Sequence, residues 1–357
     1  MRHPSPVPDP TQDQRAPGGG MTHEGSPWEQ AWHDALYGPQ GFYRLQAPAD
    51  HFATSAQGLP GGGEILAEVV LALARRHGCR RVVDVGAGRG ELLGLLRRLA
   101  PELHLTGVDV VPRPAGLAVD RWLISPGGAA LPDELTGLDD TLVLAHEWLD
   151  VIPCPVVERD EREPTGWRAV LVTAEGAEHP GPPLSGPDLQ WARRWLGPDV
   201  GRAEIGLPRD RAFSDLLSRV RSGLVVIVDY GHTAVDRPPD GTLTGFRGGR
   251  QVDPLPDGSC DLTALVAFDS LAQVMLTQDP GQPRLTQGGG QGHLTTQGAL
   301  LRELVGDPAA PVPHRLAATD PAAYLAAVAR RAALTTLCAP GGLGDFRWLL
   351  APRTARA

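Results

Sequence analysis

The stretch that most constrains this chain is a run of alternating glycines after a short apolar segment. Residues 81–85 are mostly apolar and β-branched, residues 86–90 read Gly-Ala-Gly-Arg-Gly, and residues 91–99 are rich in leucine. This order predicts a strand, a tight turn and a helix, the start of a βαβ unit. Glycines suit such a turn because, without a Cβ, they let the backbone turn sharply and approach a ligand closely. The segment therefore favours an α/β fold with a ligand at this turn.

Two acidic residues flank the glycine turn. Asp84 lies within the end of the predicted strand, and Asp109 closes the apolar run of residues 103–108. An acid about 20 residues after such glycines suits the hydroxyl groups of a ribose. A carboxylate at Asp84 would oppose a pyrophosphate, but it suits an ammonium group such as that of a methionine moiety.

The spacing of the glycines separates the candidate ligands. A dinucleotide usually takes G-x-G-x-x-G, whereas here the third glycine comes one residue early. The pattern D-x-G-x-G-x-G with a later acid favours S-adenosylmethionine as the cofactor. The residues expected to bind it are Asp84, Gly86, Ala87, Gly88, Gly90 and Asp109. The alternatives are a dinucleotide and a glycine turn that binds no ligand.

Composition excludes several classes of function. With 357 residues, 41% of them hydrophobic, the chain can form one large domain or two ordinary ones. A net charge of −9 gives no general attraction to nucleic acid or anionic lipid. Because there is neither a long apolar run nor a signal-peptide core, we expect a cytoplasmic protein without membrane or nucleic-acid partners. All basic residues are arginine, which excludes lysine chemistry, and the dispersed cysteines favour no metal site.

The pattern of apolar runs predicts the organisation of the chain. We expect a disordered tail (1–26), an N-terminal helical segment covering the site (27–78), an α/β domain (79–350) with insertions at about 154–208 and 233–300, and a tail (351–357). Strands are predicted at 81–86, 103–108, 121–125, 141–145, 223–228 and 346–351, with hairpin strands at 156–159 and 167–172. Helices are predicted at 64–77, 91–99, 187–196, 209–221, 263–276, 297–305 and 321–334.

Two further acidic segments follow predicted strands. Residues 146–153 follow the apolar run 141–145, and residues 229–232 follow the run 223–228. In an open α/β sheet, ligands bind beyond the carboxyl ends of the strands, so these segments should face the substrate. The catalytic candidates are Glu147, Asp150, Asp229 and His232, and the candidates for substrate binding are Thr54, Ser55, Trp148 and Tyr230.

Each of these candidates also has a structural interpretation. Glu147 and Asp150 are one helical turn apart and could cap the following helix. The segment 229–231 could be a plain turn, His232 a polar loop residue, and the pair 54–55 the start of a helix or turn.

Assembled in this order, the segments resemble the MidA-type methyltransferases, bacterial relatives of the mitochondrial complex I assembly factor that methylates arginine. The resemblance covers about residues 37–350 and is carried by residues 37–43, 52–57, 63–64, 84–90, 146–153, 229–231, 241–247, 261–268 and 296–298. The glycine motif is common to many methyltransferases, whereas the two later acidic motifs are more specific. The chain departs from the family at Ala56-Gln57, where the family has Pro-Glu, and at His146, where it has Asn.

The resemblance implies a Rossmann-like, seven-stranded methyltransferase fold with a β-rich insertion and a C-terminal helical extension. It also implies methyl transfer from S-adenosylmethionine to a guanidinium nitrogen of a protein arginine. Glu147 and Asp150 could then grip the guanidinium through charge-assisted hydrogen bonds. The alternatives are a methyltransferase that acts on a small molecule and a non-catalytic assembly factor that retains the cofactor-binding fold.

Overall fold

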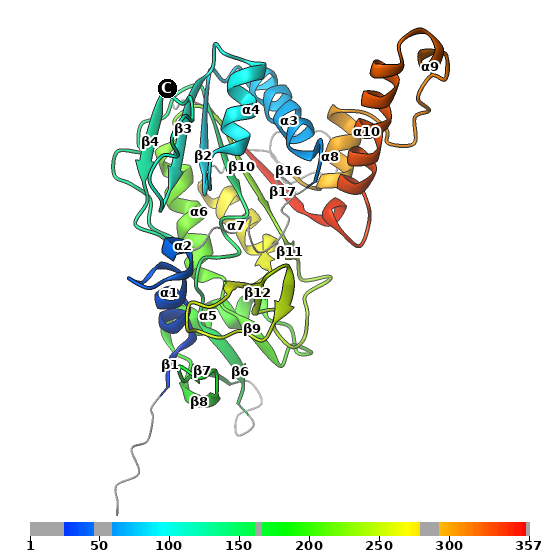
Figure 1. The fold of residues 1–357 in the computed structure, drawn as a ribbon. Helices are drawn as coiled ribbons and strands as arrows, with labels where there is room; N and C mark the ends of the chain where they lie inside the picture. Colours follow the sequence, from blue (N-terminus) through cyan, green and yellow to red (C-terminus); the bar gives the residue numbers. More distant parts are fainter. Residues whose placement is uncertain (1–24, 46–58, 161–165, 279–292, 355–357) are drawn as a thin grey trace, which may run out of the picture.

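The computed structural model describes residues 25–45, 59–160, 166–278 and 293–354, and a seven-stranded sheet lies at its centre (Figure 1). The strands lie in the order β16-β17-β10-β5-β2-β3-β4. Their bounds are β2 (Arg81–Val85), β3 (His104–Asp109), β4 (Arg121–Ile124), β5 (Thr141–His146), β10 (Gly223–Asp229), β16 (His293–Thr296) and β17 (Arg347–Arg353). The strands from β10 to β4 are parallel, and β17 is antiparallel to both of its neighbours. The predicted fold class is confirmed.

Helices pack on both faces of the sheet because strand side chains alternate between two apolar cores. Val82 and Leu142 lie in one core, and Val83 and Val143 lie in the other. The helices of the first core are α3 (Gly62–Arg76), α4 (Glu91–Leu99), α8 (Gln297–Leu304) and α10 (Pro321–Leu337). Those of the second are α6 (Leu207–Arg219) and α7 (Phe268–Gln278).

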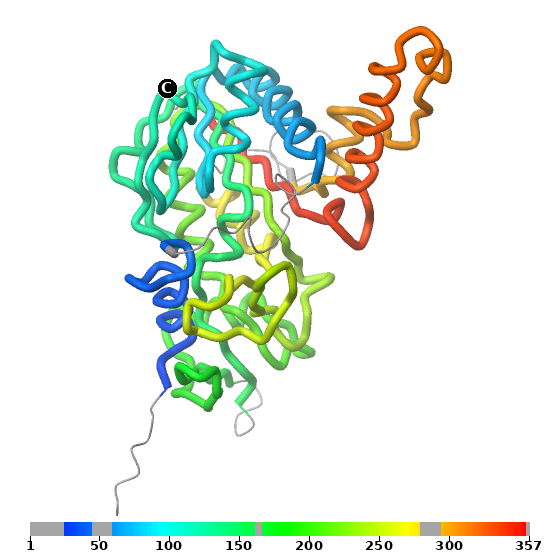
Figure 2. Tube along the Cα trace, viewed as in Figure 1, coloured from blue at the N-terminus to red at the C-terminus, as the bar shows by residue number. Residues whose placement is uncertain are grey.

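The N-terminal helices α1 (Trp28–Tyr37) and α2 (Phe42–Leu45) pack on the insertion that follows β5, as the blue and green segments of Figure 2 show. Trp28 and Trp32 are buried there together with Val156 of the insertion. The insertion consists of β6 (Val156–Arg159), β7 (Trp167–Val172), β8 (Glu178–Pro183), α5 (Gly186–Trp195) and β9 (Arg202–Glu204), and β1 (Ser26–Pro27) pairs with β7. The predicted β-rich insertion is therefore present.

One predicted helix is wrong at its start. The helix expected over residues 263–276 begins only at Phe268, because the preceding residues form strands. Here β14 (Asp261–Thr263) pairs with β12 (Thr244–Arg247), and β15 (Val266–Ala267) pairs with β11 (Gly231–His232). Apolar spacing within the segment does not reveal such long-range pairing.

Further elements were not predicted from the sequence. These include β16 of the central sheet, β8 and β9 of the insertion, β13 (Arg250–Val252), α9 (Arg315–Thr319) and a 3₁₀ helix (Leu343–Asp345). Residues 248–249 form the turn that joins β12 to β13. In addition, β17 continues to Arg353, beyond the predicted start of the C-terminal tail.

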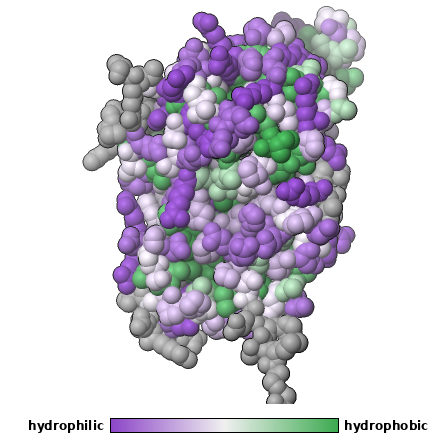
Figure 3. All heavy atoms as spheres, turned by 90° about the vertical axis from the view of Figure 1, so that its left-hand side faces the viewer, coloured by the Kyte–Doolittle hydropathy of each residue, from purple (hydrophilic) through white to green (hydrophobic). Residues whose placement is uncertain are grey.

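The surface shown in Figure 3 is mixed, with hydrophilic groups over much of this face and smaller hydrophobic areas between them. Among the described helices, none combines the length and the apolar character needed to cross a bilayer.

Candidate active site

The glycine turn joins β2 to α4 with three glycines in left-handed backbone conformations. Gly86, Gly88 and Gly90 have φ angles of 75°, 57° and 74°, which side chains with a Cβ rarely adopt. The backbone N–H groups of Gly86 and Ala87 donate to the carbonyl oxygen of Val108 at 2.9 and 3.1 Å. A Cβ added at Gly86 would lie 3.7 Å from the Cβ of Trp148, which is an ordinary van der Waals contact, so the turn passes close to this side chain. The bare backbone fits a ligand that approaches closely.

Asp109 ties the end of β3 to the glycine turn. Its carboxylate accepts hydrogen bonds from the backbone N–H groups of Gly88 at 2.7 Å and Val111 at 3.1 Å. Burial raises the pKa of Asp109, and these backbone hydrogen bonds act in the opposite direction. These hydrogen bonds support the turn, which is a structural role for Asp109. A carboxylate can accept about four hydrogen bonds, however, so Asp109 retains capacity for ribose hydroxyl groups.

We predict that Asp109→Ala weakens cofactor binding by about tenfold to a hundredfold, the value of one or two charge-assisted hydrogen bonds. The glycine turn would also lose a contact at Gly88, so part of the loss should come from a less ordered turn. Calorimetric titration with S-adenosyl-homocysteine measures the dissociation constant, and Asp109→Asn separates the charge from the hydrogen bonds. An unchanged dissociation constant in both variants would leave Asp109 with the turn alone.

Asp84 lies beneath the turn and is buried. Burial, followed by the nearby carboxyl groups of Asp109 and Glu91, raises its pKa to about 7. An ammonium group beside Asp84 would favour the charged carboxylate and lower this pKa again.

Cofactor binding should consequently release a proton and become tighter as the pH rises from about 5.5 towards 7. Below its pKa, Asp84 of the free protein is protonated and must ionise to meet the ammonium; above it, this cost disappears. Calorimetry in two buffers of different ionisation enthalpy counts the released protons. Asp84→Asn should show weaker binding without this pH dependence. Proton release that persists in the variant would assign it to another group.

Glu147 follows β5 in an unusual backbone conformation. It has φ = 53°, a left-handed value that is strained for a residue other than glycine. Its N–H donates to the carbonyl oxygen of Val228 at 2.8 Å, which fixes the residue beside the end of β10. One carboxylate oxygen lies 3.5 Å from Nδ1 of His146. Burial lowers the pKa of His146 to about 4, so this imidazole is neutral at pH 7.

Asp229 holds the loop that follows β5. Its side chain is fully buried and accepts hydrogen bonds from the N–H groups of Leu149 at 3.0 Å, Asp150 at 3.3 Å and Tyr230 at 3.1 Å. Burial, and then the negative charges of Asp150 and Glu147, raise the pKa of Asp229 well above its usual value. This geometry favours a positioning role for Asp229 over direct contact with a substrate.

Asp150 is held from several sides. Its Oδ2 accepts a hydrogen bond from the hydroxyl group of Thr263 at 2.8 Å, and its Oδ1 is buried with no hydrogen-bond partner among the described residues. Burial raises its pKa. Arg209, which the sequence did not single out, donates to the carbonyl oxygens of Asp150 at 2.8 Å, Ile152 at 3.3 Å and Leu265 at 2.9 Å.

The N-terminal helices add residues that sequence reasoning missed. The hydroxyl group of Tyr43 donates to Asp261 Oδ1 at 2.7 Å, and that of Tyr37 donates to the carbonyl oxygen of Val151 at 3.2 Å. Burial, with Asp150 adding to it, raises the pKa of Asp261 to about 8. Both tyrosines and Asp261 lie in the motifs that carry the family resemblance, which was the available signal.

The remaining candidates occupy different positions. Trp148 is buried in the core beside the glycine turn, so its side chain is not exposed to a substrate. Tyr230 is 38% exposed, and its ring lies 3.8 Å from that of Phe346. His232 is buried in β11 rather than in a loop, and burial lowers its pKa to about 3, which makes it a poor base. Thr54 and Ser55 lie outside the described residues.

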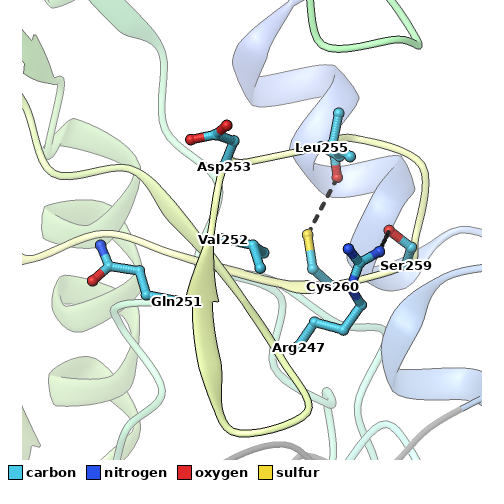
Figure 4. Close-up of a pocket in the computed structure, with 7 residues that line it drawn as sticks. All are labelled: Arg247, Gln251, Val252, Asp253, Leu255, Ser259 and Cys260. Atoms are coloured by element: carbon cyan, nitrogen blue, oxygen red, sulfur yellow. Dashed lines mark hydrogen bonds between the residues drawn. The ribbon is translucent and has the colours of Figure 1, made fainter.

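A pocket of about 410 Å³ lies elsewhere, at the β12–β13 hairpin (Figure 4). Its lining residues are Arg247, Gln251, Val252, Asp253, Leu255, Ser259 and Cys260. Because it contains none of the predicted site residues, it is separate from the glycine turn. In the part of the chain that the structure describes, no group of His, Cys, Asp and Glu is arranged to hold a metal ion.

Comparisons with other proteins bear on these features. Residues 121–281 match a family described as "putative S-adenosyl-L-methionine-dependent methyltransferase". The chain is similar to a solved structure from Burkholderia thailandensis, described as a "likely methyl transferase" bound to S-adenosyl-homocysteine. The two are 22% identical in sequence with a TM-score of 0.70, and the match covers 94% of this chain and 89% of that one. A native structure of an uncharacterized superfamily protein from the same organism gives 22% identity, a TM-score of 0.67 and the same coverage. Comparison with curated proteins finds no match.

The strand order, the glycine turn and Asp109 at the end of β3 fit an S-adenosylmethionine-dependent methyltransferase, and the family match over residues 121–281 agrees. The predicted enzyme class and cofactor are thereby confirmed. The family match and the shared fold are also consistent with the predicted resemblance to the MidA type.

Proposed function

We propose that this enzyme transfers the methyl group of S-adenosylmethionine to a guanidinium nitrogen of a protein arginine. The observation that carries the proposal is the set of carboxyl groups at the ends of β5 and β10, next to the cofactor strand β2 in the sheet. The backbone N–H of Glu147 donates to Val228, directly before Asp229, at 2.8 Å, and the N–H groups of Asp150 and Tyr230 donate to the Asp229 carboxyl group at 3.3 and 3.1 Å. These contacts bring the four residues together.

A guanidinium suits this environment because it carries a permanent positive charge and presents several N–H donors. Arg209 lies near these carboxyl groups, but its hydrogen bonds go to backbone carbonyl oxygens. Arg209 makes no hydrogen bond to these carboxylates in the structure described. A substrate cation could therefore pair directly with their negative charge.

The residues divide the chemistry between them. When bound, the cofactor supplies an activated methyl group on a sulfonium, and the glycine turn, Asp84 and Asp109 would hold it. Glu147 orients the guanidinium and accepts the proton that the methylated nitrogen loses, while Asp229 keeps the loop of Glu147 in place. Tyr230 supplies an exposed ring beside this site.

Mass spectrometry of proteins from a strain lacking the gene, compared with its parent, tests the acceptor. We expect loss of methylation at one or a few arginines, restored by the wild-type gene and not by Glu147→Gln. Restoration of an arginine methylation site by purified enzyme with labelled S-adenosylmethionine would establish direct transfer. Label found only in small molecules would favour the alternative of a small-molecule methyltransferase, and no label at all would favour the assembly factor.

A further inference from the structure

Beside the acceptor site lies a cluster of nitrogen atoms that lack acceptors. Nδ1 of His232, Nε of Arg237 and Nε of Arg347 are buried, and none has a hydrogen-bond partner in the described parts of the chain. Both Nε atoms are N–H donors, and an imidazole Nδ1 can also donate. Buried donors without acceptors are costly, so three in one place indicate a missing acceptor.

Strand pairing and hydrogen bonds bring the three residues together. The short strand of His232 pairs with β15, with His232 opposite Ala267. Arg237 donates to Asp269 at 2.6 Å, two residues after Ala267. Arg347 lies opposite Asp229 in the sheet and donates to Asp236 at 2.5 Å. Asp236 in turn accepts from the N–H of Thr233, next to His232, at 2.7 Å.

The charges in this cluster limit the ligand. Arg237 and Arg347 contribute two positive charges, while Asp236 and Asp269 offset them. His232 is neutral, because burial and then the charge of Arg237 lower its pKa to about 3. With two carboxylates in the cluster, a dianion such as phosphate is disfavoured, whereas a single carboxylate can accept from all three donors. The side chain of Arg347 is 25% exposed, which places the cluster next to solvent.

We propose that His232, Arg237 and Arg347 form a binding site for a carboxylate group of the acceptor substrate. The position supports this role, because Arg347 neighbours Asp229 and lies on the acceptor side of the sheet, where β10 and β5 separate its strand β17 from β2. That the bound carboxylate belongs to the acceptor substrate depends on the proposed function. That the three residues bind a carboxylate does not depend on it. His232 is then a hydrogen-bond donor to the substrate and not a general base.

Saturation-transfer NMR with acetate as the probe tests the site in the absence of cofactor and acceptor. Wild-type protein should give a saturable response, weakened about tenfold or more in Arg347→Met and in Arg237→Met. Arg76→Met is the matched control, since it removes an exposed arginine that pairs with Glu303 in another part of the fold. If Arg237→Met does not fold, Arg347→Met decides the test, and circular dichroism shows which variants are folded.

Three results would overturn the proposal: no saturable response to acetate, an equal response in Arg347→Met, or tighter binding of inorganic phosphate than of acetate. The protein could bind acetate in an Arg347-dependent manner and yet methylate no arginine. That result would contradict the proposed function but would still support the carboxylate site. As a second step, arginine peptides with and without a neighbouring acidic residue should differ in KM for the wild type. This difference should disappear in Arg347→Met and persist in Arg76→Met.

Discussion

Gly86→Val is expected to abolish cofactor binding while the protein remains folded. The residue has φ = 75°, and an added Cβ would contact the side chain of Trp148 at 3.7 Å, so the larger valine side chain would extend out of the turn. A β-branched side chain there would occupy the space that a cofactor needs and would strain the backbone by about 1–2 kcal/mol. Calorimetric titration with S-adenosyl-homocysteine should show at least about a hundredfold loss of affinity, since close contact along the backbone is lost.

Gly78→Val provides the matched control for Gly86→Val. Gly78 also has a left-handed backbone, with φ = 66°, but no atom lies within 4 Å of an added Cβ. It lies between α3 and β2, at the opposite end of β2 from the glycine turn, so the variant carries a similar backbone strain without the steric effect on the cofactor. Equal loss of binding in both variants would attribute the effect to general destabilisation. Normal binding by a folded Gly86→Val would show that the cofactor does not lie on this turn.

The features that the sequence predicted well depend on local patterns. The strands around Val83, Val143 and Val226 are buried on both faces, so each reads as a continuous apolar run. The glycine turn is likewise local, because the left-handed residues and the following helix are adjacent in the chain. The helix over residues 91–99 was predicted with its observed bounds.

The features that the sequence did not reveal depend on distant contacts. Tyr43 and Asp261 are 218 positions apart, and Asp229 reaches the loop of Leu149 across 80 positions. A single sequence contains no pattern that joins such residues. For the same reason Trp148 was interpreted as a substrate contact, although the folding of the loop after β5 turns it into the core. Residue type and proximity to a strand end thus identified the region of the site, but not which side chains face its interior.

This distinction changes the expected roles within the acidic group. The sequence assigned Glu147 and Asp150 the same task, but Asp150 is bound to Thr263 and lies under the loop that Asp229 holds. Asp150→Asn should therefore affect stability and activity together. Glu147 alone combines a strained backbone with a position between the ends of β5 and β10, and strain of this kind is found where function requires it.

Glu147→Gln should retain cofactor affinity and lose methyl transfer by about a hundredfold or more, the usual contribution of a positioned proton acceptor. The change keeps the shape of the side chain, but it removes the charge that pairs with the guanidinium and the group that takes its proton. Cofactor binding and transfer should be measured on the same preparation. Glu102→Gln neutralises an exposed carboxylate between α4 and β3. It should leave cofactor binding and methyl transfer unchanged.

Glu147→Gly separates a functional from a structural role for this side chain. Because the residue has φ = 53°, glycine should relieve backbone strain and leave the free energy of unfolding unchanged or higher by about 1 kcal/mol, while transfer is lost. A stability gain with loss of transfer means that the fold tolerates strain at this position for the sake of the carboxylate. Destabilisation by glycine together with loss of cofactor binding would assign Glu147 to the structure of the loop, and full transfer by either variant would remove it from the mechanism.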